Sequence, residues 1–326
     1  MTKSLLSAAC ACALLASFPA EAAQTVRLAH TAAVSHVHHE AAVQFAKAVE
    51  ARTNGEYKVE VYPAGELGDQ PALAEQITLG ALDMSIVSLG NMAMYAKELN
   101  AMTAPFLFSD YDQAHKVIDG FVMDWMNAKL EANDAVGLSM FDYGFRQTTT
   151  KGIVVNSADD LKGVKIRVPP STGLLAAFDA IGANTQRIAY SELYTSLKQG
   201  VVVGEENPVF TILADSLFET QDQLALTNHY FDCQVFLASK MFMDGLPENV
   251  RVIFKEEAVK AQNLTREKIS HGEAQVIEEL KAKGMNVTTP DRASFVSKMK
   301  PAYEKVSQLS GKAAMDELLA AIEKTK

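Results

Sequence analysis

Hydrophobic and polar residues in the first part of the chain follow two alternating patterns, one typical of strands and the other of helices. The predicted strands cover residues 25–29, 57–62 and 83–88, and the predicted helices cover residues 38–51 and 70–79. The first helix would place Ala41, Phe45 and Val49 on one face, and Gly80 suits the end of the second. This alternation is typical of an α/β fold in which helices cover both faces of a mainly parallel sheet.

A second unit of the same kind begins near residue 146, so the pattern predicts two lobes. Its predicted strands cover residues 164–168, a short segment before Tyr190, and residues 201–203, and its predicted helices cover residues 172–181 and 191–199. No long linker rich in glycine, serine or proline separates the units, so we expect the chain to cross between lobes on strands. Pro247 suits a first helical turn and Gly284 a stop, which predicts one long helix, or two nearly continuous ones, spanning both lobes.

The first residues have the pattern of a secretory signal peptide. Lys3 precedes an apolar run over 5–18, and Ala20-Glu21-Ala22 has the small-x-small form of a cleavage site. The run is shorter than the roughly 20 apolar residues that span a bilayer. We therefore predict a cleaved signal peptide over residues 1–23, lobe I over 24–144 plus about 233–272, and lobe II over 145–232 plus about 273–326.

Charge and cysteine content narrow the class of partner. The formal net charge is −10, which argues against binding to nucleic acid or to an anionic membrane surface. No later segment has eighteen uninterrupted apolar residues, so direct membrane insertion is not expected. After cleavage Cys233 is the one remaining cysteine, which excludes an internal disulfide and is expected to be buried. An anionic ligand would then need a local positive site.

Arg167 is the first candidate for such a site. Val164, Ile166 and Val168 alternate with Lys165 and Arg167 at the carboxyl end of a predicted strand, where ligands bind in open α/β sheets. A guanidinium there can hold a carboxylate through two parallel hydrogen bonds. An internal salt bridge is an equally good interpretation of these residues alone.

Several motifs, in their order and spacing, resemble the extracytoplasmic solute receptors of TRAP transporters, the tripartite ATP-independent periplasmic family. The resemblance covers nearly the whole mature chain. The motifs are YPAGELGD at 62–69, PFLF at 105–108, GFRQTT at 144–149, RVP at 167–169, YSELY at 190–194, GEENP at 204–208 and TNH at 227–229.

The resemblance implies roles for four residues of the second unit. Arg167 matches the arginine that makes the two-bond contact with the ligand carboxylate. Arg146 matches a second arginine near the ligand, which contacts it directly or through water or supports the site. Asn207 matches an asparagine that contacts the ligand or the first arginine, and Tyr190 matches an aromatic residue that packs on the ligand.

Other matched positions differ in how closely they follow the family. Glu206 and His229 match a polar pair that lies beside the second arginine around bound water in the sialic-acid receptors. Val203 and Glu205 stand where the family usually has aspartate and glutamine, a departure that leaves Asn207 intact.

By register with the family, four residues of the first unit face the cleft, and ordinary loop polarity is an equally good interpretation of them. They are Thr31, Asp69, Gln70 and Ser88. The sialic-acid receptors have a glutamate at the position of Ser88, so its absence argues against sialic acid.

The resemblance implies a monomeric receptor in the periplasm of a Gram-negative bacterium, with no cofactor. It would close on a small organic acid, a C4-dicarboxylate or a sugar acid above all, and deliver it to TRAP membrane permease subunits driven by an ion gradient. Other carboxylates and sulfonates remain open as ligands.

Two alternative functions stand beside this one. One is a receptor of an ABC importer for another anion, or for a metal bound by His36, His38 and His39. Their spacing puts these imidazoles on different sides of a helix start, with no carboxylate to complete a site, so we expect no metal. The other is a secreted hydrolase, but the mature chain has no G-x-S-x-G, G-x-G-x-x-G, phosphate-loop or C-x-x-C motif, so we expect no enzyme.

Overall fold

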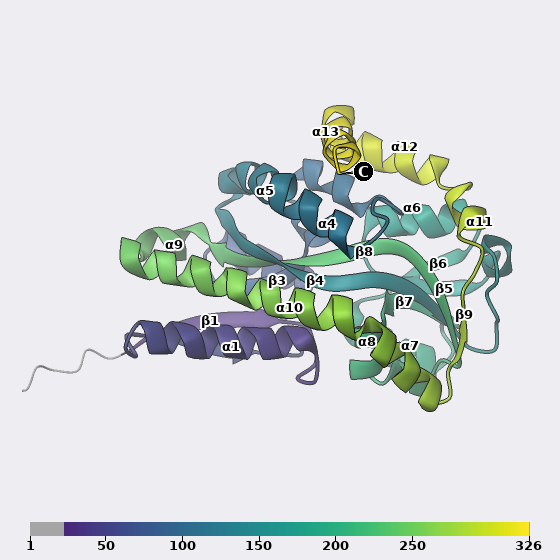
Figure 1. Cartoon of the computed structure of the whole chain (residues 1–326), viewed down its shortest axis with the longest axis horizontal. Coiled ribbons are helices and arrows are strands. Elements are labelled where there is room, and N and C mark those ends of the chain that lie inside the picture. The colour runs from purple at the N-terminus through teal and green to yellow at the C-terminus, as the bar shows by residue number, and fades with distance from the viewer. Residues whose placement is uncertain (1–22, 326) are drawn as a thin grey trace, which may run out of the picture.

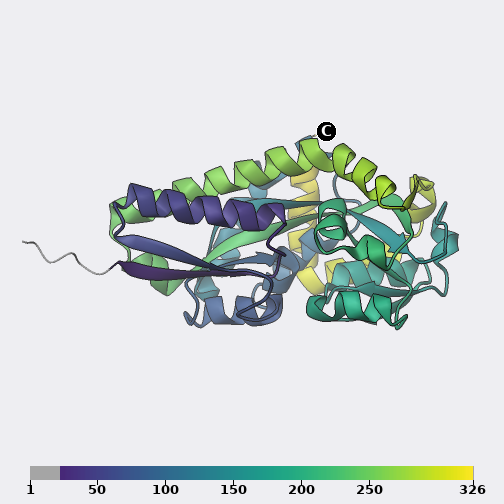
Figure 2. The same cartoon turned by 90° about the horizontal axis from the view of Figure 1, so that it is seen from below.

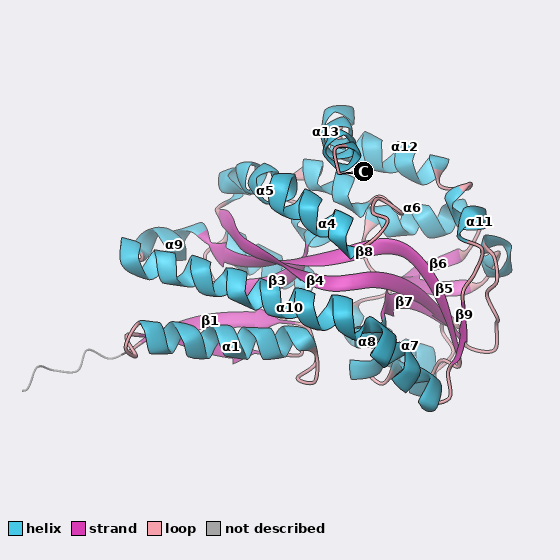
Figure 3. Ribbon diagram, viewed as in Figure 1, coloured by secondary structure: helices cyan, strands magenta, loops and turns pink. Residues whose placement is uncertain are grey.

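The computed structural model describes residues 23–325. The signal peptide predicted for residues 1–23 therefore lies almost entirely outside the described residues. Within 23–325, nine strands form one sheet with helices on both of its faces (Figures 1 and 3). The strand order is β2-β1-β3-β8-β4-β7-β5-β6, with β9 paired to β8.

The strands of the described chain are β1 (Gln24–His30), β2 (Tyr57–Tyr62), β3 (Met84–Ser88), β4 (Ala135–Thr150), β5 (Lys165–Val168), β6 (Asn184–Arg187), β7 (Gly204–Pro208), β8 (Gln223–Ser239) and β9 (Asn286–Thr288). The helices before β5 are α1 (Val37–Arg52), α2 (Gln70–Thr78), α3 (Leu89–Met92), α4 (Tyr111–Val117) and α5 (Met123–Leu130). Those after it are α6 (Thr172–Ala180), α7 (Leu193–Lys198), α8 (Val209–Ala214), α9 (Lys240–Gly245), α10 (Glu248–Ala282), α11 (Arg292–Val296), α12 (Lys300–Ser310) and α13 (Lys312–Glu323).

The α/β class is confirmed, and so are the predicted strands and helices up to β3. The strand predicted at 201–203 is wrong, because Val201 is exposed and the strand that enters the sheet is β7. All five residues of β7 are buried, yet three of them are polar (Glu205, Glu206 and Asn207), so apolar alternation indicated the segment just before it.

Two long strands carry the chain along the middle of the sheet. β4 and β8 pair antiparallel, whereas β1 with β2 and β5 with β6 pair parallel towards the two ends of the sheet. The pairing of β4 with β8 is interrupted by β-bulges, one of which lies between Arg146 and Thr148. A bulge redirects side chains locally, and Arg146 stands at the edge of this one.

Gly144 in β4 shows why one motif position must be glycine. Its φ is +107°, and a Cβ there would come within 3.2 Å of both Ile269 Cγ2 and Tyr111 Oη. An L side chain would be strained by the backbone and crowded by its neighbours.

The predicted long helix is the single helix α10, which follows Pro247 and stops before Gly284, whose φ is +100°. It runs along the length of the molecule, beside α1 at one end and α8 at the other (Figure 2). Its buried side chains also bind backbone that the sheet leaves open, since Gln262 Oε1 accepts a hydrogen bond from Met140 N at 2.8 Å.

The hydrophobic cores lie on both faces of each half of the sheet. Phe45 packs against Phe236 and Phe254 in the first half, while Val168 and Phe178 belong to a core of the second half. The C-terminal helices contact both halves, because Met299 packs in a second-half core and Leu318 in a first-half core. The lobe boundaries stay a prediction, since this packing does not assign α12 and α13 to one lobe.

Two smaller expectations concern membrane insertion and the cysteine. No helix within residues 23–325 is both long and apolar enough to cross a membrane. Cys233 is a free cysteine and is buried, as predicted.

Candidate functional site

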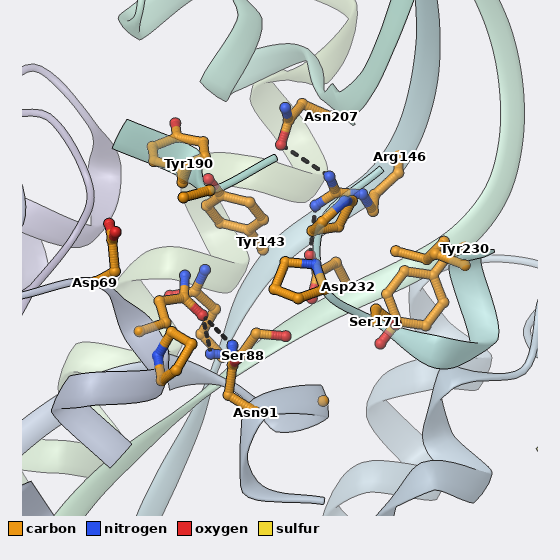
Figure 4. A pocket seen from close by; sticks show the side chains of 18 of the residues that line it. Asp69, Ser88, Asn91, Tyr143, Arg146, Ser171, Tyr190, Asn207, Tyr230 and Asp232 are labelled. Atoms are coloured by element: carbon orange, nitrogen blue, oxygen red, sulfur yellow. Dashed lines mark hydrogen bonds and ion pairs between the residues drawn. The ribbon is translucent and has the colours of Figure 1, made fainter. Parts of the chain in front are cut away.

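A pocket opens where the carboxyl ends of β3 and β5, the middle of β4 and β8, and the start of α2 meet (Figure 4). It encloses about 800 Å³ of empty space, part of which is open to solvent. Seven of the predicted site residues line it: Asp69, Gln70, Ser88, Arg146, Arg167, Tyr190 and Asn207. The sequence prediction therefore brought together residues that are up to 138 positions apart (207 minus 69).

The other three predicted residues lie next to the lining. Thr31 Oγ1 accepts a hydrogen bond from Gln70 Nε2 at 3.2 Å. Glu206 and His229 are fully buried beside Arg146, and His229 Nε2 lies 3.0 Å from Glu206 Oε2. None of these three residues is among those that line the pocket.

Arg167 is the largest fully buried side chain of the described chain, with an exposed fraction of 1%. Its Nε donates to Ile188 O at 3.1 Å, and its Cζ lies 6.0 Å from the ring centroid of Tyr190. Within residues 23–325 no carboxylate forms a salt bridge with Arg167, and its Nη1 and Nη2 have no hydrogen-bond acceptor. Burial therefore lowers the pKa of this guanidinium, although its surroundings include carboxylates.

Arg146 is equally buried but is surrounded by acceptors. Its Nε and Nη2 donate to the carboxylate of Glu206. Its Nη1 donates to Asp232 Oδ2 at 2.7 Å, and its Nη2 donates to Asn207 Oδ1 at 2.9 Å (Figure 4). Burial opposes its charge, but Glu206 and Asp232 outweigh burial and raise the pKa of Arg146. One N–H of Nη1 is left over from this network, since a guanidinium has five.

The three buried carboxyl groups around Arg146 have different pKa values. Burial by itself would raise the pKa of Glu206, but Arg146 and His229 together lower this pKa below its ordinary value. For Asp232 burial dominates over Arg146 and raises the pKa to about 6. Burial, with the nearby charge of Glu206, also raises the pKa of Glu205 to about 7. The difference follows from contacts, because Glu206 binds both Arg146 and His229 through its side chain.

Asn207 links these carboxyl groups to the pocket. Its Oδ1 accepts from Arg146, and its Nδ2 donates to Glu205 Oε2. Glu205 Oε1 also accepts from Thr149 Oγ1 at 2.7 Å. The amide of Asn207 is thereby fixed in orientation, and these contacts use one of its two Nδ2 hydrogens.

Gln70 organises the opposite wall of the pocket. Its Oε1 accepts from Ser88 N and from Asn91 Nδ2, both at 2.8 Å. Asp69 precedes α2 and accepts a hydrogen bond from Ser191 Oγ at 3.1 Å, which joins the first unit to the second. Tyr190 donates its hydroxyl to Asp215 Oδ2, so its ring is held beside Arg167.

Sequence reasoning missed further residues that line the pocket. The polar and aromatic ones are Asn91, Tyr143, Ser171, Tyr230, Asp232 and Gln234. A signal was present for the last three, because Tyr230, Asp232 and Gln234 alternate along β8 and therefore point to one face of the sheet. The sequence did not give the position of β8 in the sheet, so it could not show that these three side chains face the pocket.

The histidines of the first unit pack in pairs, with ring centroids 4.8 Å apart for His36 and His38 and 5.3 Å apart for His30 and His39. His38 Nε2 lies 2.7 Å from Asp142 O, His36 Nε2 lies 3.5 Å from Thr211 Oγ1, and His39 Nδ1 lies 3.2 Å from His30 Nε2. No group of three or more histidine, cysteine, aspartate or glutamate side chains within residues 23–325 could hold a metal ion. Burial lowers the pKa of His30 to about 3 and that of His38 to about 4.

Comparisons with known proteins identify the family and the fold of the chain. Residues 28–309 match the family model of the bacterial extracellular solute-binding proteins, family 7. The chain is 31% identical over 275 residues to the 2,3-diketo-L-gulonate-binding periplasmic protein YiaO of Escherichia coli, covering 84% of each chain. It is 29% identical over 320 residues to the C4-dicarboxylate-binding periplasmic protein DctP of Rhodobacter capsulatus, covering 95% of this chain and 96% of that one.

A solved structure gives the same result for the fold. The sugar acid binding protein DctPAm of Advenella mimigardefordensis, in complex with galactonate, superposes with a TM-score of 0.90 at 28% identity, over 93% of this chain and 99% of that one. These relatives are solute-binding proteins and not enzymes, which removes the hydrolase alternative. The chain belongs to the bacterial extracellular solute-binding proteins, family 7, the DctP-type receptors of TRAP transporters.

Proposed function

We propose that this receptor binds a small organic acid by one carboxylate, which accepts two hydrogen bonds from Nη1 and Nη2 of Arg167. The observation that carries the proposal is that Arg167 is 1% exposed, lines the pocket and has no carboxylate partner in residues 23–325. An unpaired buried charge is costly, so a site that keeps one is suited to an incoming anion. Asn207 and Tyr190 contribute an amide donor and an aromatic wall beside it.

The names of the relatives support an organic acid as ligand. One relative is named for a sugar acid, another for C4-dicarboxylates, and the superposed structure holds galactonate. We infer that the ligand of this chain is a sugar acid or a C4-dicarboxylate, bound in the periplasm after removal of a signal peptide over residues 1–23. The receptor, as a monomer, then delivers the acid to TRAP permease subunits.

We further infer that the pocket closes by a hinge motion between the lobes. Its lining comes from both units of the chain, with Ser88 and Gln70 on one side and Arg167 and Asn207 on the other. Contacts such as Ser191 with Asp69, and Ser35 Oγ with Ala214 O at 3.3 Å, join the two sides in the closed arrangement. A ligand that touches both sides favours closure by its differential affinity.

A thermal-shift screen tests the proposed function. Organic acids and the divalent cations zinc and manganese are added separately to the mature protein. We expect at least one acid to stabilise it, by about 2.7 kcal/mol at 100 times the dissociation constant. Neither cation is expected to do so.

Two outcomes would contradict the proposal. One is stoichiometric zinc or manganese in protein purified without added metal, provided that it disappears when His36, His38 and His39 are replaced. The other is a solution-scattering radius of gyration that does not decrease when a stabilising acid is added, which would refute the hinge.

A further inference from the structure

The number of unpaired cationic side chains that line the pocket limits the number of ligand carboxylates that the pocket can neutralise. Among the described lining residues, the cationic side chains are Arg146 and Arg167. Arg146 already contacts two carboxylates, those of Glu206 and Asp232, whereas Arg167 contacts none in residues 23–325. The pocket therefore has one guanidinium whose charge is not balanced by a direct partner, enough for a single ligand carboxylate.

The opposite wall has no cation among its described lining residues to balance a second carboxylate. Gln70, Ser88 and Asn91 are neutral, and Asp69 is an acid. A ligand with a second carboxylate would bring that charge towards Asp69 or Asp232, and like charges placed together at a binding site cost several kcal/mol. The electrostatics of the pocket thus separate the two ligand classes that the proposed function leaves open.

Two lining residues have polar atoms that no described residue satisfies. Asp232 has an exposed fraction of 4%, and its Oδ2 binds Arg146, but its Oδ1 is buried and makes no hydrogen bond of normal geometry within residues 23–325. The backbone N–H of Cys233 lies near enough to lower the pKa of this carboxyl group without satisfying Oδ1. Ser171 Oγ is buried and without a partner in the same part of the chain. Such groups are rare in native proteins, so each calls for a missing partner.

The position of Ser171 indicates what that partner is. Ser171 is the N-cap residue of α6, yet its side chain makes no capping bond. A Cβ placed on Gly90 would lie 3.8 Å from both Ser171 Oγ and Ser88 Oγ, so both hydroxyls border the same gap. All three residues line the pocket. Hydroxyl groups of a ligand can donate to Asp232 Oδ1 and exchange hydrogen bonds with these serines.

We propose that the site selects monocarboxylic acids that carry hydroxyl groups: Arg167 binds the carboxylate, Asp232 Oδ1 and Ser171 Oγ bind hydroxyls, and dicarboxylates are rejected. This inference rests on the proposed function, because it assumes that Arg167 holds a ligand carboxylate. It adds to that function the number of carboxylates and the residues that recognise the rest of the ligand.

Two sets of acids of matched length test the inference by calorimetry at neutral pH. The four-carbon set is erythronate, butyrate, malate and succinate, and the six-carbon set is galactonate, hexanoate, galactarate and adipate. Each set varies the second carboxylate and the hydroxyls independently. We expect erythronate or galactonate to bind about ten-fold or more tightly than every other acid of its set.

The outcomes separate this inference from the proposed function. If malate, succinate, galactarate or adipate binds as tightly as the hydroxylated monocarboxylate, and Arg167→Lys abolishes that binding, the selection is refuted while the carboxylate site stands. If none of the eight acids binds, both the proposed function and the selection are refuted.

Variants of the two hydroxyl-binding residues give a second test. Asp232→Asn should weaken binding of the preferred acid by about 10- to 100-fold, because a hydrogen bond to a charged acceptor is lost. It should weaken the matched dicarboxylate less, since a repelling charge is also removed. Asp316→Asn on α13, far from the pocket, is the matched control. An equal loss for both acids would mean that Asp232 only supports Arg146, and would overturn its role.

Ser171→Ala keeps the inference testable if Asp232→Asn does not fold. It removes a hydroxyl that makes no hydrogen bond with any described residue, so it should leave the unfolding transition of the free protein unchanged. We expect a loss of about 3- to 10-fold for the hydroxylated acid and none for butyrate or hexanoate. Unchanged affinity for the hydroxylated acid would contradict the contact.

Discussion

Arg146 and Arg167 are the same residue type, lie on strands of the same sheet and are buried to nearly the same extent, yet their surroundings are opposite. Arg146 is held by Glu206, Asp232 and Asn207, and its pKa is raised. Arg167 has one backbone acceptor and a lowered pKa. A buried arginine alone therefore does not indicate a ligand site. Under the proposed function, the number of protein partners distinguishes the supporting arginine, Arg146, from the ligand-binding one, Arg167.

The largest effect is expected from removing the paired arginine. Arg146→Met should lower the free energy of unfolding by about 3–5 kcal/mol, because it leaves the buried carboxylates of Glu206 and Asp232 without their cation. Urea unfolding of the free protein measures this, with the exposed Arg187→Met as control. If Arg146→Met has the same free energy of unfolding as the wild type, the proposed difference between Arg146 and Arg167 is wrong.

The unpaired arginine should show the reverse behaviour. Arg167→Lys should reduce ligand affinity by about 2–5 kcal/mol, because a point charge does not reproduce the planar two-bond contact. Calorimetry with the preferred acid measures the loss. The unfolding free energy of the ligand-free Arg167→Met variant should not fall below that of the wild type, since Arg167 has no carboxylate to leave unpaired in the described chain. Near-native affinity of the lysine variant would refute direct contact.

Buried histidines extend the comparison with the two buried arginines, because a histidine that stays neutral avoids the free-energy cost of burying a charge. Burial lowers the pKa of His38 to about 4, partly opposed by hydrogen bonds to Asp142 O and Gln234. In the unfolded chain its pKa is about 6.5. As the pH falls, the unfolded chain therefore binds a proton at His38 before the folded chain does. The contribution of neutral His38 to the free energy of unfolding is complete above pH 6.5 and is lost as the pH falls towards 4, at about 1.4 kcal/mol per pH unit.

His38→Gln isolates this contribution. Glutamine can still donate to Asp142 O but does not titrate. We expect the variant to lose less stability than the wild type between pH 7 and pH 5, measured by urea unfolding at each pH. Identical slopes for the two proteins would show that His38 does not contribute.

The smallest effect is expected where the two walls of the pocket meet in solvent. Ser191→Ala removes the hydrogen bond to Asp69 and should weaken ligand binding by about 0.5–1 kcal/mol. Ser297→Ala, which removes an exposed hydroxyl far from the pocket, is the control. A loss confined to the dissociation rate would support a contact made only after closure, and an increase in affinity would exclude such a contact.

The sequence could predict an element where the buried face of that element is apolar, and could not where the buried residues are polar. The α/β class, the long helix α10 and the elements from β1 to β3 could be read because their buried faces are apolar. The strand β7 could not, since its buried side chains are polar. Asn207 bonds to Glu205, and Glu206 bonds to Arg146 and His229. The resemblance to TRAP receptors supplied Asn207 at that point.

The same limit applies to the pocket. Arg167 stood out because a charge interrupts an apolar strand, and the structure places it in the lining. Its difference from Arg146 was invisible, because the partners of Arg146 come from β7 and β8, 60 and 86 positions away. Asp232 and Ser171 became candidates only once their unsatisfied atoms could be identified.

The placement of β8 and α10 has a consequence for the order in which the parts of the chain fold. Phe45 of α1 packs against Phe236 and Phe254, with ring centroids 4.8 Å and 5.8 Å apart, so the first core needs residues made some 200 positions later. Contacts between such distant residues form slowly, because a long loop must close before they are made. The emerging chain cannot complete its N-terminal half until most of its length is available. The packing of α1 is therefore among the last parts of the first core to be completed.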